Sequence, residues 1–248
     1  MKRIYLLTVF VLCASIGIAQ NHKNIVYKDG NHRLNGLITN NYNQKGLPGV
    51  LILPAWKGID SEAKVAASNL EKMGFVVFIA DIYGEGNSPK DNAEAGKLAS
   101  TYKSDFKAYQ HRIQLALNEL IKQGANPSKI AVIGYCFGGT GALEVARANM
   151  PVQGVVSIHG GLAKDVARSN NTIAPKVLVQ HPAEDKSVSK ADYDQLVEEL
   201  REGKADWQII TYANSGHTFT NSESTDFNPT MATRAWKHLV LFLEELLK

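Results

Sequence analysis

The sequence has few cysteines, few prolines and little net charge. Its 248 residues include only two cysteines, Cys13 and Cys136, and 8 prolines. With 20 glycines and 44% hydrophobic residues, this composition excludes a collagen-like chain, a disordered tail and a multi-span membrane protein. The 27 basic and 24 acidic side chains leave a formal charge of +3 without a long run of Lys or Arg. The composition therefore gives no indication of a nucleic-acid or anionic-lipid partner.

Only one long hydrophobic run is present, and it lies at the N-terminus. Lys2 and Arg3 precede an apolar stretch over residues 4–18, and Gly17 and Ala19 are small residues at the two positions that a signal peptidase reads. The run is short for a membrane span. We therefore expect a signal peptide over residues 1–19 and a mature chain, residues 20–248, that is exported to a bacterial periplasm or secreted. A buried strand or an uncleaved anchor is the alternative.

Export would leave the mature chain with one cysteine, because Cys13 is removed with the signal peptide. A single thiol cannot form an internal disulfide. Cys136 is then either a buried, inert residue or a reactive group. Its local sequence favours the second interpretation.

Short apolar strands alternate with helices along the mature chain. We expect strands at residues 25–27, 34–39, 50–53, 75–80, 130–133, 154–158, 176–180 and 207–212. We expect helices at residues 61–73, 91–99, 106–123, 139–149, 190–201 and 230–247. The alternation predicts an α/β fold in which helices cover both faces of a mostly parallel central sheet, with an N-terminal β-hairpin that turns at Asp29-Gly30. No linker or repeat divides residues 20–248, which indicates a single domain.

The most informative segment surrounds Cys136. A buried strand leads into Gly134-Tyr135-Cys136-Phe137-Gly138, a Gly-x-Cys-x-Gly pattern, and a helix follows directly. This is the nucleophile-elbow pattern with sulfur in place of the usual hydroxyl. The turn would place the thiol at a helix N-terminus, where the helix dipole favours the thiolate. The backbone N–H of Phe137 would then be free to stabilise an oxyanion.

A thiol nucleophile requires a base, and the base requires an orienting acid. Asp185 and His217 follow the last two expected strands of the sheet, at the edge where open α/β sheets carry their sites. Their order along the chain, nucleophile, acid and histidine, fits this fold class. His159 is the second candidate for the base, and Glu184 competes with Asp185 for the role of the acid.

Four motifs resemble those of the dienelactone hydrolase family, within the α/β-hydrolase superfamily. They are Gly134-Tyr135-Cys136-Phe137-Gly138-Gly139, His181-Pro182-Ala183-Glu184-Asp185, Ser215-Gly216-His217-Thr218-Phe219 and Asp81-Ile82-Tyr83-Gly84. The resemblance implies an α/β-hydrolase fold and a catalytic triad of Cys136, His217 and Asp185. It also implies a second oxyanion donor, the N–H of Trp56, which would act together with that of Phe137.

Two positions differ from the better-known members of that family. Ala55 stands where they carry a glutamate that takes part in controlling the thiol, and Asn221 stands where they carry an arginine that holds the substrate carboxylate. We expect the substrate pocket to be lined by Ala55, Lys57, Tyr83, His159, Phe219 and Asn221.

These observations predict a hydrolase of a carboxylic ester, lactone or thioester that forms a thioacyl-enzyme on Cys136. A catalytically silent binding protein and an acyltransferase are the alternatives. No cluster of His, Cys, Asp or Glu has the spacing of a metal site, and the glycines near Cys136 form no nucleotide fingerprint. We therefore expect neither a metal nor another cofactor, and a small-molecule substrate as the partner. The sequence does not indicate the oligomeric state.

Overall fold

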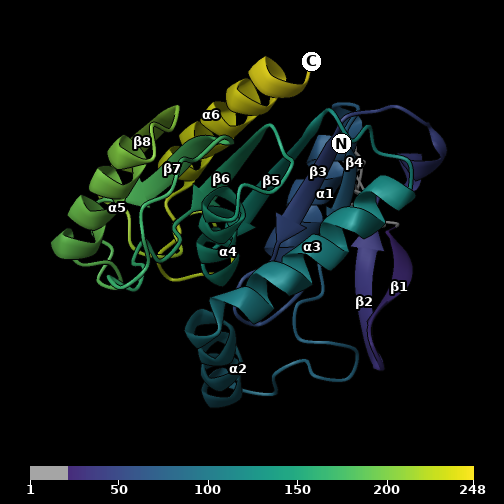
Figure 1. Ribbon diagram of the computed structural model, residues 1–248, viewed down its shortest axis with the longest axis horizontal. Helices are drawn as coiled ribbons and strands as arrows, with labels where there is room; N and C mark the ends of the chain where they lie inside the picture. The colour runs from purple at the N-terminus through teal and green to yellow at the C-terminus, as the bar shows by residue number, and fades with distance from the viewer. Residues whose placement is uncertain (1–21) are drawn as a thin grey trace, which may run out of the picture.

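The computed structural model describes residues 22–248, so the expected signal peptide lies outside the described residues. Eight strands form one sheet in the order β1-β2-β4-β3-β5-β6-β7-β8 (Figure 1). Their bounds are Lys23–Asp29, His32–Ile38, Gly49–Leu53, Val76–Ile79, Ile130–Tyr135, Gly154–Ile158, Lys176–Pro182 and Trp207–Tyr212, for β1 to β8 in chain order. The pairs β1·β2 and β2·β4 are antiparallel, and all other pairs are parallel. The predicted N-terminal hairpin and mostly parallel sheet are confirmed.

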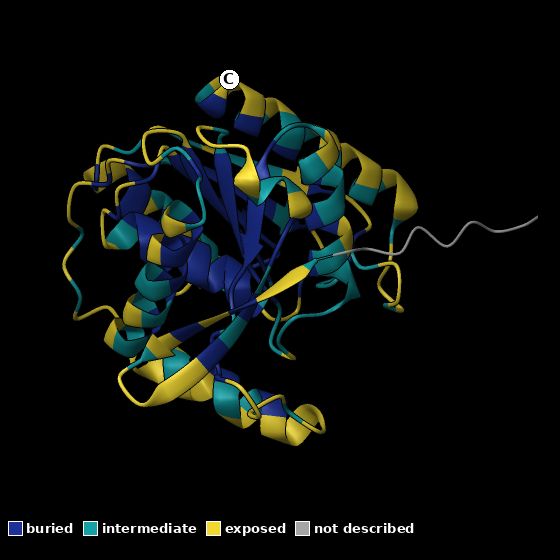
Figure 2. Cartoon of the chain, turned by 90° about the vertical axis from the view of Figure 1, so that its right-hand side faces the viewer, coloured by how far each residue is buried: buried dark blue, intermediate teal, exposed yellow. Residues whose placement is uncertain are grey.

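Burial along the strands follows from their sequences. Every residue of β3, β4, β5 and β6 is buried, as expected for continuous Val/Ile/Leu runs that are covered on both faces. In β1, by contrast, Ile25 is buried between two exposed neighbours, because the hairpin at the sheet edge has one solvated face. Figure 2 shows this contrast between the dark-blue centre of the sheet and the yellow strands of the hairpin.

Six α-helices cover the two faces of the sheet. Their bounds are Ser61–Lys72, Asn92–Ser104, Phe106–Lys122, Phe137–Arg147, Lys190–Glu202 and Pro229–Leu247, for α1 to α6. Side chains of α1 and α6 share one buried cluster, and those of α3, α4 and α5 share another. Figure 1 shows α3 and α4 in front of the sheet and α1 behind it. None of the helices in residues 22–248 is both long enough and apolar enough to cross a membrane.

Two helices differ from the sequence prediction by more than one residue at an end, and the other four differ by a single residue. α2 extends to Ser104, five residues past the expected end, and α4 begins at Phe137, two residues before the expected start. The backbone of Cys136 makes the whole strand-to-helix turn, so helical geometry begins at the next residue. The two glycines after Phe137 therefore lie inside the first turn of α4.

The start of α4 also differs from the other α-helix starts in residues 22–248. Side chains of Asp60, Asp91, Asp105, Ser189 and Asn228 cap α1, α2, α3, α5 and α6. Cys136 occupies the equivalent position in α4 and makes no side-chain capping hydrogen bond. The first N–H groups of α4 are thus left for another acceptor.

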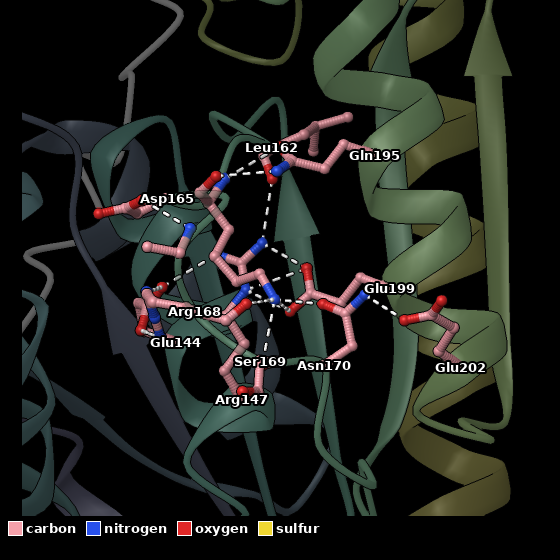
Figure 3. A network of polar contacts seen from close by, with 12 residues as sticks. Glu144, Arg147, Leu162, Asp165, Arg168, Ser169, Asn170, Gln195, Glu199 and Glu202 are labelled. Carbon is pink, nitrogen blue, oxygen red and sulfur yellow. Dashed lines mark hydrogen bonds and ion pairs between the residues drawn. The ribbon is translucent and has the colours of Figure 1, made fainter.

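A buried network of charged side chains connects α4 and α5 with the loop between β6 and β7 (Figure 3). Arg147 lies between two carboxylates, 2.9 Å from that of Glu144 and 2.8 Å from that of Glu199, and all three side chains are at most 5% exposed. Arg168 of the loop donates to both oxygens of Glu144, at 2.9 and 2.8 Å. Lys164 donates to the Arg168 and Ser169 carbonyls at 3.0 and 3.3 Å. The loop is therefore held to both helices by buried charges.

Removal of one member of this network should destabilise the protein strongly. In Glu199→Ala, Arg147 keeps only Glu144, and Lys164 loses the carboxylate that lies 3.5 Å away. Loss of one partner from a buried ion pair costs about 3–5 kcal/mol. We expect that loss in the free energy of unfolding, measured by urea denaturation. The control is Asp194→Ala, which breaks an exposed pair with Lys190 and should cost at most about 0.5 kcal/mol. Equal losses in the two variants would contradict this interpretation.

Candidate active site

The turn at Cys136 depends on the glycines on either side of it. Cys136 has φ of 53°, a backbone conformation that L residues rarely adopt. A Cβ at Gly134 would lie 1.9 Å from the carbonyl oxygen of Gly138, and a Cβ at Gly138 would lie 2.0 Å from that of Leu53. Neither position can therefore hold a side chain. The elbow predicted from the Gly-x-Cys-x-Gly pattern is present, with strained backbone at its apex.

The three side chains predicted to form a triad lie in one hydrogen-bonded line. The Sγ of Cys136 is 3.1 Å from Nε2 of His217, and Nδ1 of His217 is 2.8 Å from Oδ2 of Asp185. Asp185 follows β7, and its second oxygen accepts the N–H of Ser187 at 2.8 Å. His217 lies in the loop after β8.

Burial distinguishes Asp185 from its competitor. The carboxylate of Asp185 is fully buried, whereas Glu184 is exposed and makes only a backbone contact with Ser215. Of the two acids, the structure brings only Asp185 to the histidine.

The charges and hydrogen bonds around His217 favour its protonated form, in which both ring nitrogens carry a proton. Burial alone would lower the pKa of His217, but its hydrogen bonds to Asp185 and Cys136, together with their charges, outweigh burial and raise it to about 10. Burial would raise the pKa of Asp185, yet the hydrogen bonds from His217 and from the Ser187 N–H are together stronger, and the net direction is downward. At neutral pH the site therefore holds an imidazolium beside a carboxylate, with Nε2–H directed at the sulfur.

His159, the second candidate for the base, contacts the backbone of Cys136 and not its sulfur. Its Nδ1 accepts the N–H of Cys136 at 3.2 Å, an N–H that also reaches the Ile158 carbonyl at 3.0 Å. Its Nε2 lies 2.9 Å from Oγ1 of Thr220. Burial, reinforced by the charge of His217, lowers the pKa of His159 to about 3. His159 is thus a neutral residue that supports the elbow from behind.

The residues predicted to donate to an oxyanion lie beside the elbow. Phe137 is the first residue of α4, and its ring stacks on Tyr109 at 4.5 Å and on Tyr83 at 5.7 Å. The Trp56 carbonyl accepts the hydroxyl of Tyr83 at 2.8 Å, which ties the loop after β3 to the same aromatic cluster. The role of the two N–H groups in stabilising an oxyanion remains a prediction.

Four other residues that were predicted to line the substrate pocket differ in their burial and in their contacts. The Ala55 carbonyl closes a turn with the N–H of Gly58, and Lys57 at the tip of that turn is exposed. Phe219 is fully buried against Tyr212 and His159, so its ring holds the loop from within. Asn221 is half-buried, and its side-chain oxygen accepts the N–H of Glu223 within a local turn.

A hollow of about 520 Å³ lies on the α4 side of the elbow. Its lining includes Tyr102 and Tyr109, whose rings lie 6.5 and 4.5 Å from that of Phe137, and also Arg168. Because Arg168 already donates to both oxygens of Glu144, its charge is not free for a substrate. Lys103 and Lys164 also line the hollow; Lys164 donates to the Arg168 and Ser169 carbonyls, whereas Lys103 is exposed.

Two residues that are connected by hydrogen bonds to the turn at Cys136, Thr220 and Glu62, were not predicted from the sequence. Thr220 donates to Oε1 of Glu62 at 2.6 Å and, through His159, connects that carboxylate with the N–H of Cys136. Glu62 lies in the first turn of α1, where an acidic residue is common, and is 158 positions away from Thr220. No local pattern could have indicated this contact. Within residues 22–248, no group of three or more His, Cys, Asp or Glu side chains is arranged to hold a metal ion.

Comparisons with known proteins agree on one family. Residues 34–247 match the sequence profile of the dienelactone hydrolase family. A Bradyrhizobium protein, described as "Probable 2-oxo-3-(5-oxofuran-2-ylidene)propanoate lactonase", is 24% identical over 208 residues, which are 79% of this chain and 83% of that protein. A dienelactone hydrolase-like promiscuous phosphotriesterase from metagenomic libraries is 30% identical, with a TM-score of 0.85 over 92% of this chain and 99% of that one. Esterase 2 of Thermogutta terrifontis, at 15% identity, shares the fold with a TM-score of 0.62 over 90% of this chain and 94% of its own.

The low pKa of His159 predicts a specific dependence of stability on pH. In the unfolded chain a histidine takes up a proton near pH 6.5, whereas His159 in the folded protein does so only near pH 3. Between these values the unfolded state binds more protons, so the free energy of unfolding should fall as the pH falls, by up to about 1.4 kcal/mol per unit. His217 adds nothing in this window, because its raised pKa makes its contribution complete below about pH 6.5 and lost only toward about pH 10.

Urea denaturation from about pH 7 to about pH 4 would measure this slope. His159→Asn should lose part of the acid dependence, whereas His32→Asn, an exposed residue at the tip of the hairpin, should keep the wild-type slope. Identical slopes in both variants would show that His159 does not titrate in this way.

Proposed function

The chain belongs to the dienelactone hydrolase family, and we propose that it hydrolyses neutral carboxylic esters or lactones through Cys136, His217 and Asp185. The observation that carries this proposal is the hydrogen-bonded line from sulfur to imidazole to carboxylate, at 3.1 and 2.8 Å. A cysteine with only a structural role does not require a histidine beside it that is oriented by a buried acid, whereas a nucleophilic thiol does. The position of Cys136 at the uncapped start of α4 supports the same role.

In the first half of the proposed reaction, the Cys136 thiolate attacks the carbonyl carbon of the substrate. The carbonyl π electrons move to oxygen, and the N–H groups of Phe137 and Trp56 stabilise the resulting oxyanion. The intermediate collapses as the C–O bond to the alcohol breaks, and His217 donates its Nε2 proton to the leaving oxygen. The products of this half are a free alcohol, or the ring-opened end of a lactone, and a thioacyl-enzyme.

In the second half, His217 is neutral and accepts a proton from a water molecule as that water attacks the thioester. The second tetrahedral intermediate collapses, the C–S bond breaks and Cys136 leaves as the thiolate. The acid product departs, and the imidazolium–thiolate pair is restored. Asp185 holds Nδ1–H throughout, which fixes the histidine with Nε2 toward the sulfur.

We also propose that the protein is exported. The support is the charged start, apolar run and small-residue cleavage site over residues 1–19. N-terminal sequencing of the protein recovered from the periplasm or the medium should begin at Gln20.

The role of the triad can be tested with two neighbouring acids. Asp185→Asn removes the charge that orients His217 and should lower kcat for a p-nitrophenyl ester by about 10²–10⁴-fold. Glu184→Gln is the matched control, because Glu184 is exposed, and it should leave kcat unchanged. Cys136→Ala should abolish turnover. A wild-type protein without turnover on ester, lactone and thioester panels would favour a silent binding protein, and product transfer to an added alcohol would favour an acyltransferase.

The substrate class follows from the charges near the site. The lactone in the name of the Bradyrhizobium relative carries a carboxylate, but Asn221 stands here where the family resemblance leads one to expect arginine. The guanidinium that lines the neighbouring hollow is bound by Glu144. Lys103 also lines the hollow and Lys57 lies at the exposed turn, but a lysine ammonium cannot clamp a carboxylate as a planar guanidinium does. A carboxylate would therefore lose its hydration in this site without gaining a bidentate partner.

We therefore expect kcat/KM to be about ten- to a hundredfold higher for p-nitrophenyl butyrate than for the mono-p-nitrophenyl ester of succinate, because a missing charge-assisted hydrogen bond costs about 1.5–3 kcal/mol. Asn221→Arg should narrow that ratio, whereas Asn221→Gln should preserve it. A wild-type preference for the charged ester would exclude this substrate class.

A further inference from the structure

A second cavity lies on the opposite face of the sheet from α4, between α1 and α6. Its volume is about 240 Å³, and its lining includes neither Cys136 nor His217. A cavity of about 150 Å³ is enough to bind benzene, so this one is large enough for a substituted aromatic ring. Most of its wall is apolar, from Ala66 of α1 and Ala235, Trp236 and Leu239 of α6. We refer to it below as the α1/α6 cavity.

Both charged side chains that line the α1/α6 cavity are carboxylates. Glu62 and Glu223 both line it, and neither has an ion-pair partner among the residues that the structure describes. Glu62 receives one hydrogen bond, from Thr220 at 2.6 Å. Burial raises the pKa of Glu62 to about 7, with the Thr220 hydrogen bond opposing and the charge of Asp60 adding to the rise. A cation beside Glu62 would offset this cost of burial.

Tyr135 supplies an independent indication of a ligand. It is 5% exposed and lines the same cavity, yet its hydroxyl forms no hydrogen bond with any residue in the described part of the chain. The Tyr135 oxygen is not among the fully buried side-chain atoms without a partner in residues 22–248, so it is open to the cavity, where a bound donor can reach it. The charges of Glu62 and Asp60 both act on this hydroxyl, so it lies close to the acidic end of the cavity. A ligand donor placed there would meet the carboxylate and the hydroxyl oxygen together.

We propose that the α1/α6 cavity binds a small organic ammonium ion that carries an aromatic or short apolar group. The ammonium would donate to Glu62 and the Tyr135 oxygen, while the exposed carboxylate of Glu223 at the rim would add negative charge. The apolar group would pack against Leu239 and the Trp236 ring, which also attracts cations. A metal ion is a poorer occupant, since these carboxylates are not among any metal-ligating group in residues 22–248. An anion would face two unpaired carboxylates.

One residue that lines the α1/α6 cavity also takes part in the hydrogen bonds that support the turn at Cys136. Thr220 lines the cavity, donates to Glu62 and lies 2.9 Å from Nε2 of His159, which in turn accepts the N–H of Cys136. Binding in the cavity and chemistry at the sulfur nevertheless use different side chains. The two can therefore be tested separately.

Isothermal titration of the wild-type protein with three ligands of similar shape tests the proposal. Benzylammonium, benzyl alcohol and benzoate differ mainly in the charge of the head group. We expect benzylammonium to bind at least tenfold more tightly than benzyl alcohol, with no binding of benzoate. Equal affinities of the ammonium and the alcohol would overturn the proposal without any variant being made.

Variants then locate the site. Glu62→Gln should weaken benzylammonium binding at least tenfold and Tyr135→Phe severalfold, whereas Glu198→Gln, an exposed residue of α5, should not change it. Thermal unfolding of each variant confirms that it is folded. If affinity is unchanged in Glu62→Gln but lost in Cys136→Ala, the amine occupies the hydrolytic site and the proposal is wrong. That result would leave the proposed hydrolase activity intact.

Discussion

The backbone conformation of Cys136 is the constraint on which the rest of the site depends. A φ of 53° turns the chain from β5 directly into α4, and it is tolerated only because Gly134 and Gly138 leave room for the carbonyl oxygens that pass within about 2 Å of their missing side chains. The same turn leaves the start of α4 uncapped and directs the sulfur toward His217. Strain at one residue thus fixes the position of the sulfur, of the helix that follows it and of the sulfur relative to His217.

Much of the fold could be predicted from hydrophobic patterns, because each strand of the parallel sheet is a short run of buried Val, Ile and Leu between turn residues. The start of α4 could not. Gly138 and Gly139 are poor helix formers, so the pattern placed the helix after them. In the folded chain a side chain at position 138 would clash with the backbone of β3, so only glycine fits there. The two segments are about 85 residues apart in the sequence. Tertiary packing there outweighs local propensity.

The three members of the hydrogen-bonded line could be named in advance, because chain order and strand ends in this fold class restrict them to a few loops. Asp185 is buried against His217 and Glu184 is exposed, a difference that the adjacent acids do not reveal in the sequence. The support behind the elbow was not predictable either. Thr220, His159 and Glu62 come from three separate segments, and none of them has a sequence signature for this role. Sequence patterns indicate reactive groups more readily than the groups that orient them.

The buried network of charged side chains also limits which substitutions this protein can accept in evolution. Its members are Arg147, Glu144, Glu199, Lys164 and Arg168. Replacing any one of them leaves an opposite charge unpaired in the interior, so single substitutions should be selected against even though none of these residues meets the sulfur. The loop between β6 and β7 is consequently inherited together with α4 and α5. A loop grafted from a relative would need matching residues on both helices, whereas the exposed side chain of Lys57, on the other side of the elbow, has no such buried partner. New specificities should therefore arise first at that position.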